Sequence, residues 1–202
     1  RHVELGSLAL QNIGSASITA VNGDIVGNGV LSIAGNLTLT AGQIYEPTAT
    51  SFTVAAYDYV EGAAARTGSI TTRLSGGARQ LPLSAGSTLS LFATTIDHAG
   101  VLRAPFVTIR LGWDGTGAAP RELLTGSTLP FPVTTELTLA PGSVTSVSAI
   151  DPISGQGVII PYGASLDGTS WLDPRGVDIT VSGLPEKQVL LQGVNISTQA
   201  GA

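Results

Sequence analysis

Apolar and polar side chains alternate along short stretches of this chain, and these stretches end at a glycine. Residues 36–44 read NLTLTAGQI, so the two leucines lie two positions apart and point to one face of a strand. The glycine three positions later can adopt a turn conformation. Residues 81–86 (LPLSAG) and 137–142 (LTLAPG) repeat this pattern. We interpret each copy as a strand followed by a corner, which predicts a chain that wraps repeatedly around one core.

Apolar markers also recur at a nearly constant interval. One series runs through Leu10, Leu31, Phe52, Ile70, Leu89 and Val107, and after a gap it resumes at Leu137, Val158, Val177 and Ile196. A second series runs through Ile18, Leu39, Tyr59, Leu81 and Leu102. Neighbouring markers within a series are 18 to 22 residues apart. This spacing predicts a parallel β-helix with about 20 residues per coil, because the strands of a sandwich keep no such register.

Two segments depart from the regular spacing. Residues 113–132 open on WDGTG and close on PFP, and residues 151–175 hold a second cluster of turn-forming residues. Such segments do not fit a central strand, so we expect loops or hairpins that project from a single domain spanning 1–202. Both tryptophans of the chain lie in these two segments.

Composition supports an all-β fold with a polar, weakly charged surface. The 202 residues include 26 glycines and 11 prolines, and the longest run without either, residues 48–61, is rich in strand-forming Thr, Val, Phe and Tyr. Charged residues make up 11 % of the chain, against about 25 % in typical soluble domains. The exposed face must therefore be polar through Ser, Thr, Asn and Gln, as suits a secreted surface.

The charge pattern argues against two classes of partner. The net charge is −5, and the nine Lys and Arg residues form no cluster that could bind nucleic acid or anionic lipid. No apolar run approaches the roughly 20 residues of a membrane helix. The chain has no cysteine, and it begins at Arg1 without a signal-like segment. We expect a processed product or a piece of a longer chain.

Four blocks of the sequence resemble the large filamentous-haemagglutinin-like exoproteins. These blocks are 36–45 (NLTLTAGQIY), 100–112 (GVLRAPFVTIRLG), 137–148 (LTLAPGSVTSVS) and 160–171 (IPYGASLDGTSW). The resemblance implies a right-handed parallel β-helix that is exported through an outer-membrane secretion partner and acts as an adhesin or filament on Gram-negative cells. The chain lacks the amino-terminal secretion domain of that family, so the resemblance is to the repetitive shaft.

The two ends of the chain carry no amphipathic helix that could cap a stack of coils. An uncapped coil offers unpaired backbone groups to other strands. We therefore expect further coils to continue from these ends, either in the parent chain or in a neighbouring copy.

Polysaccharide cleavage is one alternative function, because it needs carboxylates or a carboxylate and a base that converge on a groove. There are two candidate sets: Asp97 and His98 with Arg103, and Asp167 with Asp173 and Arg175. We favour polar turns at these positions, since Asp before Gly bonds its own backbone in tight turns. With only two histidines in the chain, we predict no catalytic residue, no metal site and no cofactor.

Carbohydrate binding is a second alternative. Aromatic rings stack on sugar rings, and neighbouring acids accept hydrogen bonds from their hydroxyls. The candidate glycan contacts are Trp113, Asp114, Tyr162, Asp167 and Trp171. The competing interpretation, which we favour, is that each tryptophan packs its loop against the shaft, because large aromatic residues are usually well buried.

Two sequons, at Asn36 and Asn195, are candidate sites of asparagine glycosylation. Our prediction from the sequence is a structural shaft of a secreted cell-surface protein, and not an enzyme. Its expected partners are neighbouring coils, host or surface glycans and the outer-membrane secretion partner.

Overall fold

The computed structural model describes residues 2–77, 80–106, 108–121, 129–151, 154–157, 163–173, 176–183 and 187–202. These residues form strands, turns and loops without any helix, so the all-β prediction is confirmed. Accordingly, no described segment is a helix of the length and apolarity that crossing a bilayer requires. Val107, Val158, Tyr162 and Arg175, which the sequence analysis singled out, lie outside the described residues.

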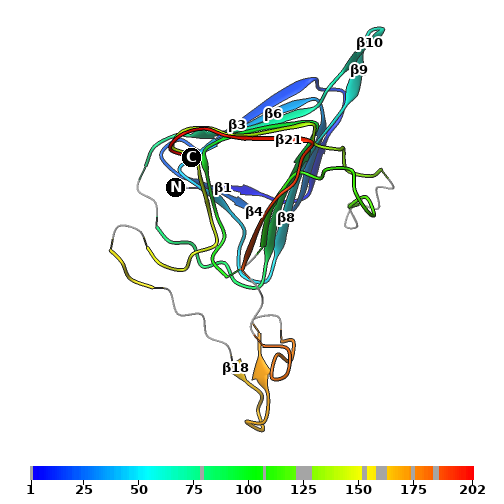
Figure 1. Ribbon diagram of the computed structural model, residues 1–202. Helices are drawn as coiled ribbons and strands as arrows, with labels where there is room; N and C mark the ends of the chain where they lie inside the picture. The colour runs from blue at the N-terminus through cyan, green and yellow to red at the C-terminus, as the bar shows by residue number, and fades with distance from the viewer. Residues whose placement is uncertain are drawn as a thin grey trace.

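Three parallel sheets make up the body of the molecule. Sheet A contains β1 (His2–Leu5), β4 (Asp24–Gly27), β7 (Ile44–Tyr45), β14 (Val101–Arg103) and β17 (Val144–Ser146). Sheet B contains β2 (Leu8–Leu10), β5 (Gly29–Ala34), β8 (Ser51–Tyr57), β12 (Thr88–Ala93), β15 (Thr108–Leu111) and β20 (Gln188–Leu191). Sheet C contains β3 (Ser15–Thr19), β6 (Asn36–Ala41), β11 (Ser69–Leu74), β13 (Thr95–Ala99), β16 (Glu136–Leu139) and β21 (Asn195–Thr198). The chain visits A, B and C in turn, and Figure 1 shows the sheets as the three sides of a triangle.

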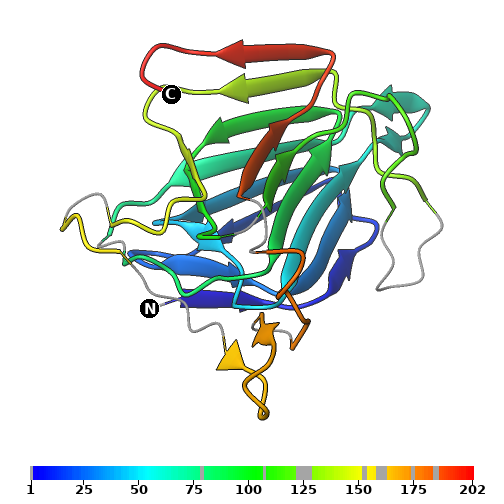
Figure 2. The same ribbon diagram turned by 60° about the horizontal axis from the view of Figure 1, so that its bottom comes forward.

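Two short antiparallel hairpins stand apart from these sheets. They are β9 (Tyr59–Glu61) with β10 (Ala64–Arg66), and β18 (Gly163–Ala164) with β19 (Trp171–Leu172). Figure 2 shows both hairpins outside the stacked strands. The second belongs to the segment 151–175 that we expected to project.

The core consists of apolar ladders that cross each sheet from strand to strand. In sheet C one ladder runs in register through Ala16, Leu37, Ile70, Ile96, Leu137 and Ile196. Alternate residues of the same strands, such as Thr38 and Thr71, face outward because successive side chains of a strand point to opposite faces. The leucines of the alternating stretch 36–41 thus line the interior, as predicted.

The constant interval holds only at the start of the chain. Leu39 lies opposite Ile18, which is 21 positions earlier (18 to 39), but its next partner is Thr72, 33 positions later (39 to 72). Phe52 and Ile70, consecutive markers in our series, belong to different sheets. The marker series is therefore wrong beyond the first strands, because insertions of unequal length separate the later ones.

Two of the three predicted strand-and-corner stretches are confirmed. Strands β6 and β16 carry their leucines inward, and Gly142 after β16 takes a left-handed φ of 76° in the following turn. The third stretch, 81–86, is not a strand, and Leu83 is 70 % exposed. Pro82 has no N–H to donate to a ladder, which disfavours a strand at this position.

This third stretch explains an interruption in sheet A. Between β11 and β12 the described residues, 75–77 and 80–87, contribute no strand to sheet A, and β14 pairs directly with β7 through Leu102 and Ile44. Residues 80–87, which we call the strap, run outside the sheet instead. The strap and the sheet face next to it form the candidate site described below.

A second, smaller apolar cluster covers the outer face of sheet B. The Phe131 ring stacks on Phe92 with 4.4 Å between centroids and lies 6.3 Å from the Tyr57 ring. Trp113 packs against the same cluster. The segment 113–132, which we expected to project as a loop, therefore returns to the sheet at the ends that the structure describes.

Candidate functional site

Hydrogen bonds tie the strap to residues on both sides of β7 (Ile44–Tyr45). The Gln43 Nε2 atom donates to the Gln80 carbonyl at 2.7 Å, and the Ala49 amide donates to the Ala85 carbonyl at 2.7 Å. Thr48 donates its hydroxyl to the carbonyl of Leu83 at 3.2 Å. The strap is thus held at several points along its length.

Glu46 lies beneath the strap with its side chain fully buried. Its Oε1 atom accepts hydrogen bonds from the hydroxyls of Ser84 (3.3 Å) and Ser87 (3.0 Å). Its Oε2 atom has no partner among the described residues. Burial raises the pKa of this carboxyl to about 7, and the two serine hydrogen bonds offset that rise only in part.

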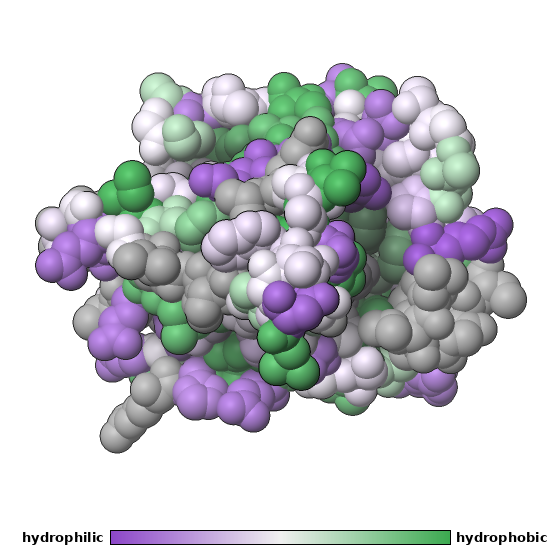
Figure 3. Space-filling view, turned by 90° about the horizontal axis from the view of Figure 1, so that it is seen from below, coloured by the Kyte–Doolittle hydropathy of each residue, from purple (hydrophilic) through white to green (hydrophobic). Residues whose placement is uncertain are grey.

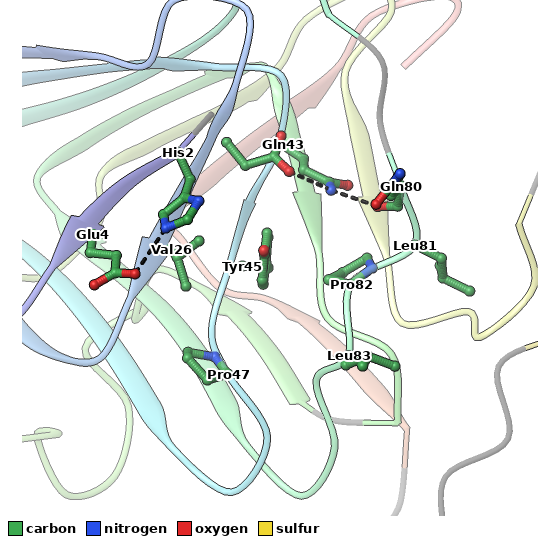
Figure 4. A pocket seen from close by; sticks show the side chains of 11 residues that line it. His2, Glu4, Val26, Gln43, Tyr45, Pro47, Gln80, Leu81, Pro82 and Leu83 are labelled. Atoms are coloured by element: carbon green, nitrogen blue, oxygen red, sulfur yellow. Dashed lines mark hydrogen bonds and ion pairs between the residues drawn. The ribbon is translucent and has the colours of Figure 1, made fainter.

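A groove of about 420 Å³ separates the strap from the outer face of sheet A. It is lined by His2, Glu4, Asp24, Val26, Gln43, Tyr45, Pro47, Gln80, Leu81, Pro82 and Leu83. In Figure 4, His2 and Glu4 form one side, Gln80 to Leu83 form the other, and Tyr45 lies between them. We call this cavity the strap groove.

Strand register arranges the floor of the strap groove in two rows. His2 lies opposite Asp24, whereas Val26 is paired with Glu4 on one side and Tyr45 on the other. His2 Nε2 lies 2.8 Å from Glu4 Oε1, and Gln43 donates to Asp24 Oδ2 at 3.0 Å. The groove thus combines carboxylates, an amide and one aromatic ring over three adjacent strands.

Two carboxylates line the described part of the strap groove. They belong to Asp24 and to Glu4, which lies 2.8 Å from His2. Burial, and secondarily the negative charge of Asp24, raise the pKa of the Tyr45 hydroxyl.

The acid–base candidates of sheet C lie on opposite faces. His98 points into the core, where its Nδ1 atom accepts the hydroxyl of Thr72 at 2.6 Å and its Nε2 atom donates to the carbonyl of Val144 at 3.2 Å. Burial lowers the pKa of His98. Asp97, one residue earlier, is on the outer face, and Arg103 is buried in β14. The strand does not bring these residues together in one groove.

The second set of acids forms turns, as we interpreted from the sequence. Asp167 accepts the Thr169 amide at 3.1 Å and also bonds the Ser165 hydroxyl, and these bonds lower its pKa to about 2. Asp173 accepts the Val177 amide at 2.9 Å. Arg175, the third member of the set, lies outside the described residues.

The candidate glycan contacts are not gathered in one place. Trp113 is half-buried and its indole N–H donates to the Thr116 carbonyl at 2.9 Å, while Asp114 caps the same turn. Trp171 is 59 % exposed on β19. Tyr162 lies outside the described residues. Packing thus accounts for Trp113, and a glycan contact at these residues stays a prediction.

No protein-family model, no curated protein and no solved structure matches this chain. The resemblance to filamentous-haemagglutinin-like proteins therefore stays a prediction. Function must be inferred from the geometry of the chain itself.

Both sequons occupy the same ladder at the start of the strands of sheet C. This ladder runs in register through Ser15, Asn36, Ser69, Thr95, Glu136 and Asn195. Both asparagines are exposed, but Asn36 accepts the hydroxyl of Ser69 at 2.7 Å and Asn195 donates to Glu136 at 2.8 Å. Glycosylation at these positions stays a prediction.

Sequence reasoning missed every residue of the strap groove. His2 and Glu4 lie at the start of the chain, and the strap was read as a strand. The signal that could have found them is the pairing of β1 with β4 and of β4 with β7, which places His2, Asp24 and Gln43 side by side.

The two tryptophans are expected to respond differently to substitution. Trp113→Ala removes an aromatic side chain that packs on the cluster of Phe92 and Phe131, so we expect a loss of about 2–3 kcal/mol in unfolding free energy. Trp171→Ala removes a mostly exposed ring and should change it by less than about 1 kcal/mol. Urea unfolding of both variants tests this; equal losses would show that the β18–β19 hairpin is packed as tightly as the cluster on sheet B.

Proposed function

We propose that this chain is a stretch of right-handed parallel β-helix that serves as a structural shaft of a secreted bacterial cell-surface protein. The observation that carries the proposal is the in-register stacking of three parallel sheets around continuous apolar ladders. Each added coil extends the backbone hydrogen bonds and the apolar core by one layer. Stiffness along the axis is the mechanical property that such a stack supplies.

The open strand edges support a shaft that continues. Strands β1, β2 and β3 at one end, and β17, β20 and β21 at the other, each have a single pairing partner among the described residues. Apolar side chains are exposed there as well: Ile196 is 45 % and Leu8 44 % exposed. Further coils, from the parent chain or from a neighbouring copy, would satisfy these edges.

The location and export route follow from the sequence resemblance. A filamentous-haemagglutinin-like shaft would be exported by an outer-membrane partner that recognises a separate amino-terminal domain. The hydroxyl-rich ladders of sheet C and the low charged fraction suit an extracellular surface.

Glycan binding by the β18–β19 hairpin is the second candidate function. The exposed indole of Trp171 favours it, because an unpacked aromatic ring can stack on a sugar. Figure 3 views the molecule from the side of this hairpin, where apolar and polar side chains are interspersed.

Sedimentation of the purified chain tests the shaft proposal. We expect association that rises with concentration and is reduced by Ile196→Lys, which places a charge at the open end of an apolar ladder. Ser197→Lys, whose side chain faces outward in the same strand, is the matched control. A chain that stays monomeric throughout, or variants that both associate like the wild type, would contradict end-to-end continuation.

A further inference from the structure

We propose that the strap is a pH-sensitive switch, which is closed over Glu46 in acid and opens when Glu46 loses its proton. The inference goes beyond the shaft proposal and does not depend on it. Glu46 directly follows β7, an inner strand of sheet A, so the strap lies away from the open strand edges. The proposal rests on where the carboxyl of Glu46 lies and on what holds the strap.

The side-chain hydroxyls that anchor the strap converge on Glu46. Ser84 and Ser87 are both buried, and each donates its hydroxyl to the Oε1 atom of Glu46. The strap itself contains no charged residue. Its other hydrogen bonds among the described residues join amides, hydroxyls and backbone carbonyls. Glu46 is therefore the one ionisable group in these contacts.

The proton of Glu46 decides whether this contact is stable. In its protonated form the carboxyl is neutral, and Oε1 can still accept both serine hydroxyls. In its ionised form a fully buried carboxylate keeps one oxygen, Oε2, without a donor among the described residues. Burying a charge that is incompletely hydrogen-bonded is unfavourable, whereas opening the strap gives the carboxylate access to water. Ionisation therefore favours the open strap.

Neighbouring charges do not offset the cost of ionising this carboxyl. The register of β7 with β4 and β14, extended by one or two positions, places Gly27 and Ala104 beside it. The ionisable residues of these two strands are Asp24 and Arg103, and that of β7 is Tyr45, which lines the strap groove. Strand β12, which follows the strap, has none. Burial raises the pKa of the buried carboxyl to about 7, and no neighbouring charge is among the causes.

The direction of the switch follows from these values. The pKa of Glu46 is about 7 under the closed strap, against an ordinary value of 4.5 once the open strap exposes it. The closed state is therefore fully favoured below pH 4.5, and this advantage is lost as the pH rises through 7. Between pH 5 and pH 8 the equilibrium constant for closing should fall about 70-fold.

Amide hydrogen exchange followed by NMR tests the switch in the whole chain. The Ala49 amide donates to the strap carbonyl of Ala85 at 2.7 Å, so its protection reports whether the strap is closed. We expect Ala49 to exchange by a local opening that low urea does not accelerate. Amides of β6 and β11, inner strands of sheet C, should exchange only through urea-dependent unfolding. Protection of Ala49, corrected for the intrinsic exchange rate at each pH, should fall about 70-fold from pH 5 to pH 8.

Variants assign the pH dependence to one residue. Glu46→Gln keeps an acceptor for the strap serines but cannot ionise, so its Ala49 protection should be the same at pH 5 and pH 8. Glu136→Gln makes the same replacement at an exposed carboxyl of sheet C and should keep the wild-type pH dependence. Circular dichroism confirms that each variant is folded, and Glu46→Leu replaces Glu46→Gln if the latter does not fold.

Three outcomes would overturn the proposal. Exchange of Ala49 only together with the amides of β6 and β11 would show that the strap does not open separately. Wild-type protection that is constant with pH, or that changes equally in the uncharged Glu46 variant, would show that Glu46 does not control the strap. Loss of the pH dependence in Glu136→Gln would assign the control to another carboxyl. None of these results alters the expected self-association, so the switch and the shaft fail separately.

Discussion

Replacing Leu39 with aspartate is expected to prevent stable folding. Leu39 is fully buried in an inner ladder of sheet C, between Ile18 and Thr72. A carboxylate at this position has no counter-ion and would lose its hydration, at a cost of about 5 kcal/mol or more. Because whole domains are stable by about 5–15 kcal/mol, this one change removes much or all of the margin.

Circular dichroism and urea unfolding measure the effect. Thr38→Asp is the control, because Thr38 is the neighbouring residue of β6 and faces outward. It should change the unfolding free energy by less than about 1 kcal/mol. If Leu39→Asp were as stable as Thr38→Asp, this would contradict the burial of Leu39 in an inward-facing ladder.

Glu46→Gln is expected to stabilise the chain at high pH. The pKa of Glu46 is about 7 in the folded chain, above its ordinary value of 4.5. Between pH 4.5 and pH 7 the folded state holds a proton that the unfolded state has released. The free energy of unfolding therefore falls as the pH rises from 4.5 through 7. By pH 8 the loss amounts to about 3 kcal/mol, which a neutral amide of similar shape avoids.

Urea unfolding of the wild type and of Glu46→Gln at pH 5 and pH 8 tests this. We expect the variant to match the wild type near pH 5 and to exceed it at pH 8. His98 acts in the opposite direction: burial lowers its pKa, so stability falls as pH drops below its ordinary value of 6.5. His98 is present in both proteins, so its contribution cancels when their unfolding free energies are subtracted at each pH. If that difference did not change with pH, it would contradict a buried, proton-binding Glu46.

Local patterns predicted the strands well. In residues 36–41 the alternation of leucine and threonine is sufficient, because one face meets a dry core and the other meets solvent. Residues 137–139 follow the same rule. The first strand pairs were predicted as well, since the segments between them are short and of similar length.

Features that depend on contacts between distant parts of the chain could not be predicted from local patterns. Leu81 and Leu83 have the spacing of a strand, but Pro82 and the strap's hydrogen bonds to Gln43 and Thr48 hold them outside the sheet. The Thr72–His98 pair is buried because the register of two strands 26 positions apart (72 to 98) aligns them. The residues next to His98 in the sequence are typical of a turn and do not indicate that His98 pairs with Thr72.

The strap groove could not be predicted from the sequence for the same reason, since it depends on long-range strand pairing. Its floor depends on which strands are adjacent, and its wall depends on a strand that is missing from sheet A. Irregularities of this kind are where functional sites tend to occur, because a regular stack buries its side chains or exposes them on flat faces.

Electron microscopy of the native, full-length protein tests the shaft most directly. The proposal predicts a thin, straight rod in which strands repeat along the axis every 4.8 Å or so, the spacing of hydrogen-bonded strands. Antibodies against this chain should bind along the rod itself. Compact particles without an axial strand repeat, or label confined to a globular head, would contradict it.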